Sequence, residues 1–286
     1  MVEKKAGTLY VVATPIGNLG DMTARAVLVL QQVDKIAAED TRHSAALLKH
    51  YAINKPAISL HNFNERERVQ QVLDMLLAGE SIALISDAGT PLISDPGYHL
   101  VREAKAQGIT VSPIPGACAL IAALSAAGLA TDRFVFEGFL PAKAEARRQQ
   151  LQTFVQEPRT VIFYEAPHRL QEMLQAMLQV FGGTRKAVVA REISKVYESI
   201  LSGDIQMLAD YYAAHTDECR GEVVVLLAGA EAADDAKVSL RPQAVLSILL
   251  QELPLKQAVT LACKITGERR NVLYEAALAQ KPDNNS

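Results

Sequence analysis

The first 130 residues alternate short apolar runs with amphipathic segments, and this alternation restricts the chain to few folds. The apolar runs have the length of strands, and the segments between them, such as 21–32 and 65–78, have the apolar spacing of helices. Strands and helices in alternation favour an α/β layer with a largely parallel sheet. The predicted strands lie at 9–13, 35–38, 57–60, 81–85 and 110–113.

The pattern changes from residue 133 onward, where strand-like runs have fewer helical segments between them. This predicts a second α/β domain with a mixed sheet. Small and charged residues without an apolar period follow residue 229 and indicate a linker, and three short helical patterns come after it. The expected division is an α/β domain over 1–128, a second α/β domain over 129–230, a linker over 231–240, a helical module over 241–280 and a frayed tail over 281–286.

The most unusual loop follows the predicted strand at 81–85. Between residues 86 and 97 it holds two glycines, two prolines, two carboxylates and three hydroxyls. Glycines let a backbone approach a bound molecule, and prolines stiffen a loop. A turn capped by Asp and Ser would explain a shorter loop, so we interpret this one as a ligand loop. Ligands of parallel sheets bind beyond the carboxyl ends of the strands, and the corresponding loops are 14–20, 39–42, 86–97 and 113–119.

Composition and missing motifs argue against several common functions. A formal net charge of −3 disfavours a generally basic nucleic-acid surface, although it permits a local basic face. Three cysteines and six histidines lack the spacing of disulfide frameworks or metal sites, so no metal is expected. The sequence has no dinucleotide fingerprint, triphosphate loop or Gly-x-Ser-x-Gly elbow. Without a signal-peptide pattern or an apolar run of about 18 residues, we expect a cytoplasmic protein with no membrane partner.

Five short motifs resemble the tetrapyrrole-methylase superfamily, and more closely its ribosomal RNA branch. They are Thr-Pro-Ile-Gly-Asn-Leu-Gly-Asp at 14–21, Ala-Glu-Asp-Thr-Arg at 38–42, Ser-Asp-Ala-Gly-Thr-Pro at 86–91, Pro-Ile-Pro-Gly-Ala at 113–117 and Phe-Tyr-Glu-Ala-Pro-His-Arg at 163–169. The resemblance implies S-adenosylmethionine as methyl donor, two α/β domains with the donor in the cleft between them, and a homodimer. The branch methylates the ribose 2′-hydroxyl of a cytidine near the decoding centre of small-subunit (16S) rRNA, so the implied partner is that RNA or the 30S subunit.

The same resemblance implies which residues hold the donor. Asp87, Gly89 and Thr90 are the firmest positions, and Tyr164 would close the pocket from the second domain. Residues 116–118 open a helix whose backbone N–H groups could face the donor, while a close-packed helix start is the alternative. The implied donor-binding residues are Pro15, Ile16, Gly17, Asp87, Gly89, Thr90, Ile93, Ser94, Asp95, Gly116, Ala117, Cys118 and Tyr164.

Transfer to a ribose hydroxyl needs an aligned methyl group and a group that accepts the proton. The carboxylates nearest to the inferred cleft are Glu39, Asp40 and Glu165, and any of them could act as the base. For Asp40 the alternative is the cap of a helix that starts at residue 41. Arg42 and Arg169 could hold phosphates or could pair with those carboxylates. The predicted catalytic group is Glu39, Asp40, Arg42 and Glu165.

Basic residues gather in clusters that together could follow an RNA backbone. Each cluster taken singly is typical of a solvated helix face. The C-terminal helical patterns resemble a helix-turn-helix-like module of the ribosomal branch, which favours rRNA as substrate; a module that only packs against the dimer is the alternative. The predicted RNA-binding residues are Arg66, Arg68, Lys143, Arg147, Arg148, Arg169, Lys264, Arg269 and Arg270.

We therefore expect a cytoplasmic, dimeric 2′-O-methyltransferase of small-subunit rRNA that uses S-adenosylmethionine. Two alternatives stay open. One is an enzyme that methylates a tetrapyrrole or another small molecule, and it would act on a precorrin without RNA. The other is a non-catalytic RNA-binding protein with the same fold, and it would bind no donor.

Overall fold

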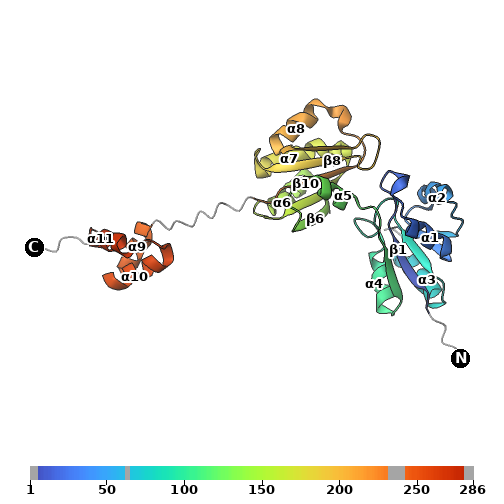
Figure 1. Cartoon of the computed structure of the whole chain (residues 1–286), viewed down its shortest axis with the longest axis horizontal. Coiled ribbons are helices and arrows are strands. Elements are labelled where there is room, and N and C mark those ends of the chain that lie inside the picture. The colour runs from blue at the N-terminus through green and yellow to red at the C-terminus, as the bar shows by residue number, and fades with distance from the viewer. Residues whose placement is uncertain (1–5, 62–64, 231–241, 280–286) are drawn as a thin grey trace, which may run out of the picture. The chain divides into compact units, whose positions relative to one another are not determined.

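The computed structural model describes residues 6–61, 65–230 and 242–279 and consists of two compact units, residues 1–230 and 231–286 (Figure 1). The first unit contains two five-stranded sheets, and the described part of the second contains three helices. The predicted linker at 231–240 and tail at 281–286 lie outside the described residues.

The first sheet is parallel throughout, which confirms the prediction from the alternating pattern. Its strand order is β3-β2-β4-β1-β5. All four residues of the central strand β4 are buried, as is typical of a strand that is covered on both faces. The loop at 86–97 therefore leaves the middle of the sheet at its carboxyl edge. The strands are β1 (Thr8–Val12), β2 (Lys35–Ala38), β3 (Ala57–Ser59), β4 (Ile82–Ile85) and β5 (Thr110–Ile114).

Helices cover both faces of this sheet because successive side chains of a strand point to opposite sides. On one face Leu84 packs in a core with α3 (Glu65–Leu77) and α4 (Tyr98–Ala106). On the other face Ile85 packs in a core with α1 (Ala24–Gln32) and α2 (Thr41–His50). The continuous apolar character of β4 is thus explained by two separate cores.

Helix α1 begins later than the sequence pattern predicts. The predicted segment at 21–32 splits into a 3₁₀ turn, η1 (Leu19–Asp21), and the α-helix from Ala24. The side chain of Thr23 accepts a hydrogen bond from Ala26 N at 3.1 Å and caps the helix. The cap residue, rather than apolar spacing, sets this boundary.

The second sheet is mixed, as predicted, with the order β6-β7-β10-β8-β9. Strands β6 and β7 are parallel, and the other three pairings are antiparallel. A bulge lies between Phe136 and Gly138, where Gly138 has a φ of 64°. The strands are β6 (Phe134–Phe139), β7 (Thr160–Glu165), β8 (Lys186–Arg191), β9 (Ser199–Asp204) and β10 (Val223–Leu227).

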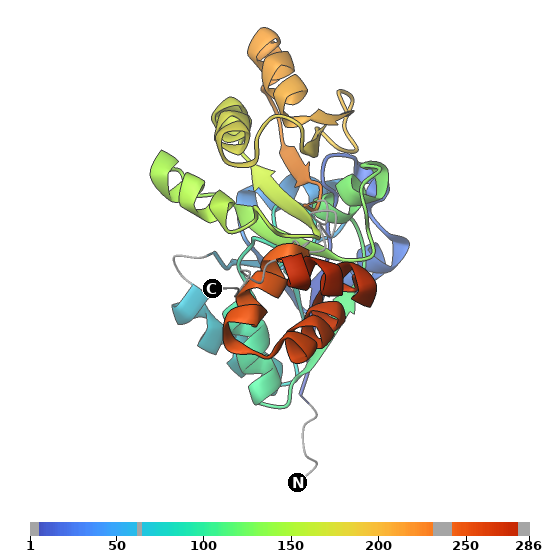
Figure 2. The same cartoon turned by 90° about the vertical axis from the view of Figure 1, so that its left-hand side faces the viewer.

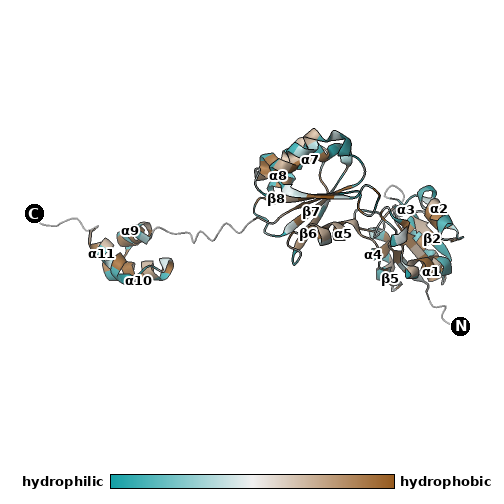
Figure 3. Cartoon of the chain, turned by 45° about the horizontal axis from the view of Figure 1, so that its top comes forward, coloured by the Kyte–Doolittle hydropathy of each residue, from teal (hydrophilic) through white to brown (hydrophobic). Residues whose placement is uncertain are grey.

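The second sheet also has a core on each face, and successive side chains of β7 enter them in turn. Phe163 packs with α6 (Ala144–Gln152), α7 (Leu170–Phe181) and α8 (Ile205–Ala214), whereas Ile162 packs with α5 (Ala119–Ala126). In Figure 3 the hydrophobic colour is strong within this sheet, while α7 and α8 carry both colours. The face that holds α5 also receives Tyr164 and Ile93, the latter from the 86–97 loop of the first half.

The second unit is a group of three helices with its own core, coloured orange to red in Figure 2. Leu246, Val259 and Leu273 are buried in it, one from each helix. Gly267 has a φ of 70° and ends the second helix, which explains the break predicted at this turn. The helices are α9 (Pro242–Glu252), α10 (Leu255–Thr266) and α11 (Arg270–Ala279).

Two leucines of α1 provide a matched test of the first core. Leu30 is fully buried, whereas the side chain of Leu28 is 54% exposed. We expect Leu30→Ala to lower the free energy of unfolding by about 2–5 kcal/mol, because it removes apolar contacts and leaves a cavity. Leu28→Ala should change it by less than about 0.5 kcal/mol. Urea denaturation of both variants measures the difference, and equal effects would contradict this assignment of faces.

Candidate functional site

Two loops at the carboxyl edge of the first sheet are joined directly by their backbones. Thr14 N donates to Gly89 O at 2.8 Å, and Gly89 N donates to Thr14 O at 3.0 Å. Thr14 follows β1 and Gly89 follows β4, and these strands are neighbours. The edge where parallel strands end is therefore closed into a continuous floor.

A pocket of about 340 Å³ lies above this floor. Its volume is in the range of about 300 to 1,000 Å³ that is common for small-molecule sites. The wall comes from the loops after β1, β4 and β5 and from four places in or beside the second sheet. The lining residues are Ile16, Ala88, Gly89, Thr90, Ile93, Ser94, Asp95, Cys118, Ala119, Phe139, Tyr164, Glu165, Ala166, Pro167, Ile193, Gly221, Glu222, Val223 and Val224.

Most of the residues implied to hold the donor line this pocket. Eight of the 13 implied residues are lining residues: Ile16, Gly89, Thr90, Ile93, Ser94, Asp95, Cys118 and Tyr164. The other five, which are not among the lining residues, are Pro15, Gly17, Asp87, Gly116 and Ala117.

Gly116 and Ala117 support the pocket from behind. The Thr90 hydroxyl donates to Ala117 O at 3.0 Å. A Cβ atom on Gly116 would lie 2.9 Å from the Cβ of Ala13, so glycine is needed for close packing of two loops. For Gly116 and Ala117 the structure thus favours a role in close packing before α5 over a direct contact with the donor.

The backbone of the 86–97 loop is strained at two positions. Leu92 has a φ of 74° and Ser94 a φ of 70°, values that side chains other than glycine rarely adopt. Gly89 and Gly97 also have positive φ angles, of 79° and 121°. Strained residues of this kind cluster at binding sites, where the surrounding structure holds them in place. The loop is therefore built for a defined shape.

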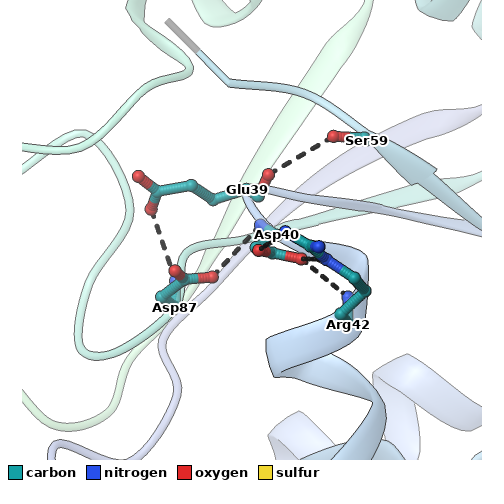
Figure 4. Close-up of polar contacts among 5 residues, drawn as sticks. All are labelled: Glu39, Asp40, Arg42, Ser59 and Asp87. Carbon is teal, nitrogen blue, oxygen red and sulfur yellow. Dashed lines mark hydrogen bonds and ion pairs between the residues drawn. The ribbon is translucent and has the colours of Figure 1, made fainter.

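The carboxylates of Glu39, Asp87 and Asp95 lie near one another beside the pocket. Asp87 Oδ1 accepts from Asp40 N at 3.1 Å, and Glu39 Oε2 accepts from Asp87 N at 3.4 Å (Figure 4). Burial, together with the charges of Glu39 and Asp87, raises the pKa of Asp95 to about 6. Burial also raises the pKa of Glu39, assisted by the charges of Asp87 and Asp40. This side of the pocket thus favours a positively charged ligand.

Asp40 is the cap of α2, the alternative considered for it from the sequence. Its Oδ1 accepts from Arg42 N at 2.8 Å, and its Oδ2 lies 3.0 Å from Arg42 Nη2 (Figure 4). These hydrogen bonds lower the pKa of Asp40 to about 2. A carboxylate with so low a pKa is a weak base, which argues against Asp40 as the proton acceptor.

Glu165 lines the pocket and pairs with Arg169, which is half-buried. The Glu165 side chain is fully buried, accepts from Ala166 N at 2.8 Å and lies 3.2 Å from Arg169 Nε. Arg169 Nη2 donates to Leu140 O at 2.6 Å and to Pro141 O at 3.1 Å. Arg169 thus shows the pairing with a carboxylate that the sequence offered as the alternative to a phosphate contact. Burial raises the pKa of Glu165, which lines the pocket, and its role as base stays a prediction.

The predicted RNA-binding residues differ in how exposed their side chains are. Arg147 is buried and pairs with Glu172 at 2.9 Å, which corrects its predicted role on an RNA-facing surface. Arg148 is exposed and pairs with Glu145 on its own helix. Arg66 has no described side chain. The remaining exposed residues are Arg68 and Lys143 in the first unit and Lys264, Arg269 and Arg270 in the second.

The second sheet contributes pocket residues that the sequence did not reveal. Phe139, Ile193 and the residues from Gly221 to Val224 line the wall. The rule that places ligands beyond the carboxyl ends of strands applies to parallel sheets, and this sheet is largely antiparallel. The Tyr164 hydroxyl accepts from Leu120 N at 3.2 Å, and burial raises the pKa of Tyr164 to about 12. Tyr164 is thus a neutral wall residue that links β7 to α5.

Within residues 6–61, 65–230 and 242–279, no group of three or more His, Cys, Asp or Glu side chains could hold a metal ion. No helix in the same ranges is long and apolar enough to cross a membrane. Cys118, Cys219 and Cys263 are free and half-buried.

Comparison with known families gives two matches along the chain. Residues 8–209 match the family model of Tetrapyrrole (Corrin/Porphyrin) Methylases, and residues 236–281 match the model of the RsmI C-terminal HTH domain. The first match includes every element that lines the pocket except β10 and the residues just before it.

Similar proteins are found over almost the whole length. A ribosomal RNA small subunit methyltransferase I of Pseudomonas aeruginosa is 57% identical over 277 residues, covering 96% of this chain and 98% of that protein. One of Haemophilus influenzae is 49% identical over 275 residues, covering 96% and 97%. The crystal structure of uroporphyrin-III C-methyltransferase from Thermus thermophilus, complexed with S-adenyl homocysteine, has the same fold, with a TM-score of 0.54, 18% identity and coverage of 78% and 98%.

The two arginine–carboxylate pairs of the site provide a matched test. We expect Arg169→Met to lower the free energy of unfolding by about 3 kcal/mol, because it leaves the Glu165 carboxylate buried without a cation. Arg42→Met should have little effect on it, because the Arg42 side chain is 91% exposed and solvent screens its pair with Asp40. Urea denaturation at pH 7 measures both. Equal small losses of stability would contradict the anchoring role of Arg169.

Proposed function

Because this chain belongs to the tetrapyrrole (corrin/porphyrin) methylase family, we propose that it transfers a methyl group from S-adenosylmethionine to small-subunit rRNA. The relatives that share about half of its residues over nearly its full length carry the name ribosomal RNA small subunit methyltransferase I. That similarity is the observation that carries the proposal. The second match, to a C-terminal helix-turn-helix model, supports a nucleic-acid substrate.

The pocket suits S-adenosylmethionine in size and charge. Ile16, Ile93 and Val224 offer apolar contacts for the adenosine, and the glycine at 89 lets the backbone come close. Asp95 lines the pocket and is mostly ionised at pH 7, given its pKa of about 6. An ionised carboxylate there would hold the positively charged end of the molecule.

The bound donor supplies an electrophilic methyl group on a sulfonium centre. The chain's own residues would orient the substrate and take up the hydroxyl proton. Glu39 is the strongest candidate for the proton acceptor, because Asp40 is held by Arg42 and Glu165 is buried with Arg169. Burial raises the pKa of Glu39 toward the range that suits a general base, and it does the same for Glu165, which is the second candidate.

The proposal extends to the acceptor nucleotide, the oligomeric state, the cellular location and the residues that contact RNA. We infer that the acceptor is the 2′-hydroxyl of a cytidine near the decoding centre of 16S rRNA, within the 30S subunit. We also infer a homodimer that works in the cytoplasm, where free cysteines are the normal state. The exposed Arg68, Lys143 and Arg148 would contact RNA phosphates in the first unit, and Lys264, Arg269 and Arg270 would do so in the second.

A direct transfer assay separates this function from the two alternatives. The purified protein is incubated with tritiated S-adenosylmethionine and either 30S subunits from cells that lack this activity, free 16S rRNA or a precorrin. We expect label in a ribose of the RNA of the 30S subunits. Label in the precorrin alone would establish a small-molecule methylase, and absence of donor binding would establish a non-catalytic RNA-binding protein.

The raised pKa of Asp95 predicts a pH dependence of donor binding. Only the ionised carboxylate attracts a cation, and its pKa of about 6 leaves most of it protonated at pH 5. We expect the apparent affinity for S-adenosylmethionine to be about tenfold weaker at pH 5 than at pH 7, following the ionised fraction. Isothermal titration calorimetry across this range measures the slope.

Two variants control this experiment. Asp95→Asn should bind weakly at pH 7 and lose the slope. Glu39→Gln should keep the slope but shift its midpoint to lower pH, because the charge of Glu39 helps to raise the pKa of Asp95. An unchanged slope in Asp95→Asn would show that another group is responsible.

A further inference from the structure

The loop between β8 and β9, residues 192–198, is fixed to the wall of the pocket at its base. Ile193 lines the pocket, as do Gly221 and Glu222 just before β10. Glu192 N donates to Glu222 O at 2.9 Å, and Glu222 N donates to Glu192 Oε1 at 2.8 Å. The β8–β9 loop therefore starts at the mouth of the pocket.

This loop has a strained and well-braced backbone. Glu192 has a φ of 52° and Ser194 a φ of 69°, both in the left-handed region. Lys195 N donates to Glu192 O at 2.9 Å, and Ser194 N donates to Glu198 Oε2 at 2.6 Å. Strain at two nearby residues persists only where it is stabilised by such contacts, and it is typical of binding segments.

The β8–β9 loop also reaches the first half of the unit. The Ser194 hydroxyl donates to Asp21 Oδ2 in η1. The Lys195 side chain lies over Gly17 and leaves no room for a Cβ atom there. The ammonium group of Lys195 is 2.8 Å from Glu192 Oε1 and 3.5 Å from Glu222 Oε2. Contacts on both sides of the pocket mouth thus hold the loop in position.

The tip of this loop, residues 196 and 197, exposes two large apolar side chains to solvent. Val196 is 92% exposed and Tyr197 is 73% exposed, the two highest values among the exposed large hydrophobic residues of the described chain. Scattered apolar residues on a surface need no explanation. Two adjacent ones on a strained loop beside the pocket indicate a contact with a partner.

The tip has the size of a contact with one nucleobase. A stable contact between two copies of the chain buries about 800 Å² on each side, so these two side chains by themselves do not make one. One aromatic ring matches one nucleobase, and RNA is read mainly through unpaired bases that stack on aromatic side chains. The ammonium group of Lys195 is already paired, so the contact would be with a base rather than with a phosphate.

We propose that Tyr197, supported by Val196, stacks on an unpaired base of the RNA strand next to the nucleotide whose ribose enters the pocket mouth. This inference rests on the proposed rRNA methyltransferase function. It assigns to Val196 and Tyr197, at the tip of the β8–β9 loop, a role in selecting the RNA substrate and none in holding the donor.

The test compares Tyr197→Ala and Tyr197→Phe with Tyr98→Ala, which removes a tyrosine that is 59% exposed on α4. Methylation of 30S subunits from cells that lack this activity gives KM and kcat, and calorimetry gives donor affinity. We expect Tyr197→Ala to raise the KM for 30S subunits ~5- to 150-fold, the loss typical of one stacked base. Tyr197→Phe and Tyr98→Ala should keep the KM, and all three should keep the donor affinity.

Different outcomes overturn different statements. An unchanged KM in Tyr197→Ala, or an equal loss in Tyr98→Ala, would overturn the stacking role. A lower sedimentation mass of Tyr197→Ala would show that the tip contacts a second copy instead, which also overturns it. Failure of the unaltered protein to methylate 30S subunits would overturn the proposed function itself, and this inference with it.

Discussion

The pocket depends on the pair of backbone hydrogen bonds between Thr14 and Gly89. These two bonds join the loops that leave the neighbouring strands β1 and β4 at the edge where parallel strands end. Thr14 is buried, and its hydroxyl also approaches Ser86 O at 3.4 Å. The positions of Ile16 on one loop and Thr90 on the other follow from this pairing. The floor of the pocket is therefore formed by main-chain hydrogen bonds, and the lining side chains project from it.

Similar carboxylates have different uses in this site because their surroundings differ. Asp40 is held as an anion by Arg42, whereas Glu165 is locked with Arg169 in the wall. Burial raises the pKa values of both Asp95 and Glu39. The charges of Glu39 and Asp87 add to the shift of Asp95, and the charges of Asp87 and Asp40 add to that of Glu39. A cation bound beside Asp95 would relieve that repulsion. Electrostatics thus separates structural carboxylates from those left for binding and proton transfer.

Much of the first sheet could be predicted because its strands are short, apolar and separated by regular helices. The loop at 86–97 also stood out, since its glycines, prolines and hydroxyls have no use in a packed element. The roles of arginines could not be predicted, because burial of Arg147 and Arg169 depends on packing between distant segments. The pocket wall from Ile193 and Gly221 was missed for a similar reason: no sequence rule marks ligand positions on an antiparallel sheet.

A crystal structure of this chain with S-adenosylhomocysteine tests the central claim most directly. We expect the ligand in the pocket between the two sheets, in contact with Gly89, Asp95 and Tyr164. Its charged amino-acid end should lie on the side of Asp95, and the Thr14–Gly89 pairing should be unchanged. A ligand bound at another place on the protein, or in this pocket with its amino group far from Asp95, would contradict the account.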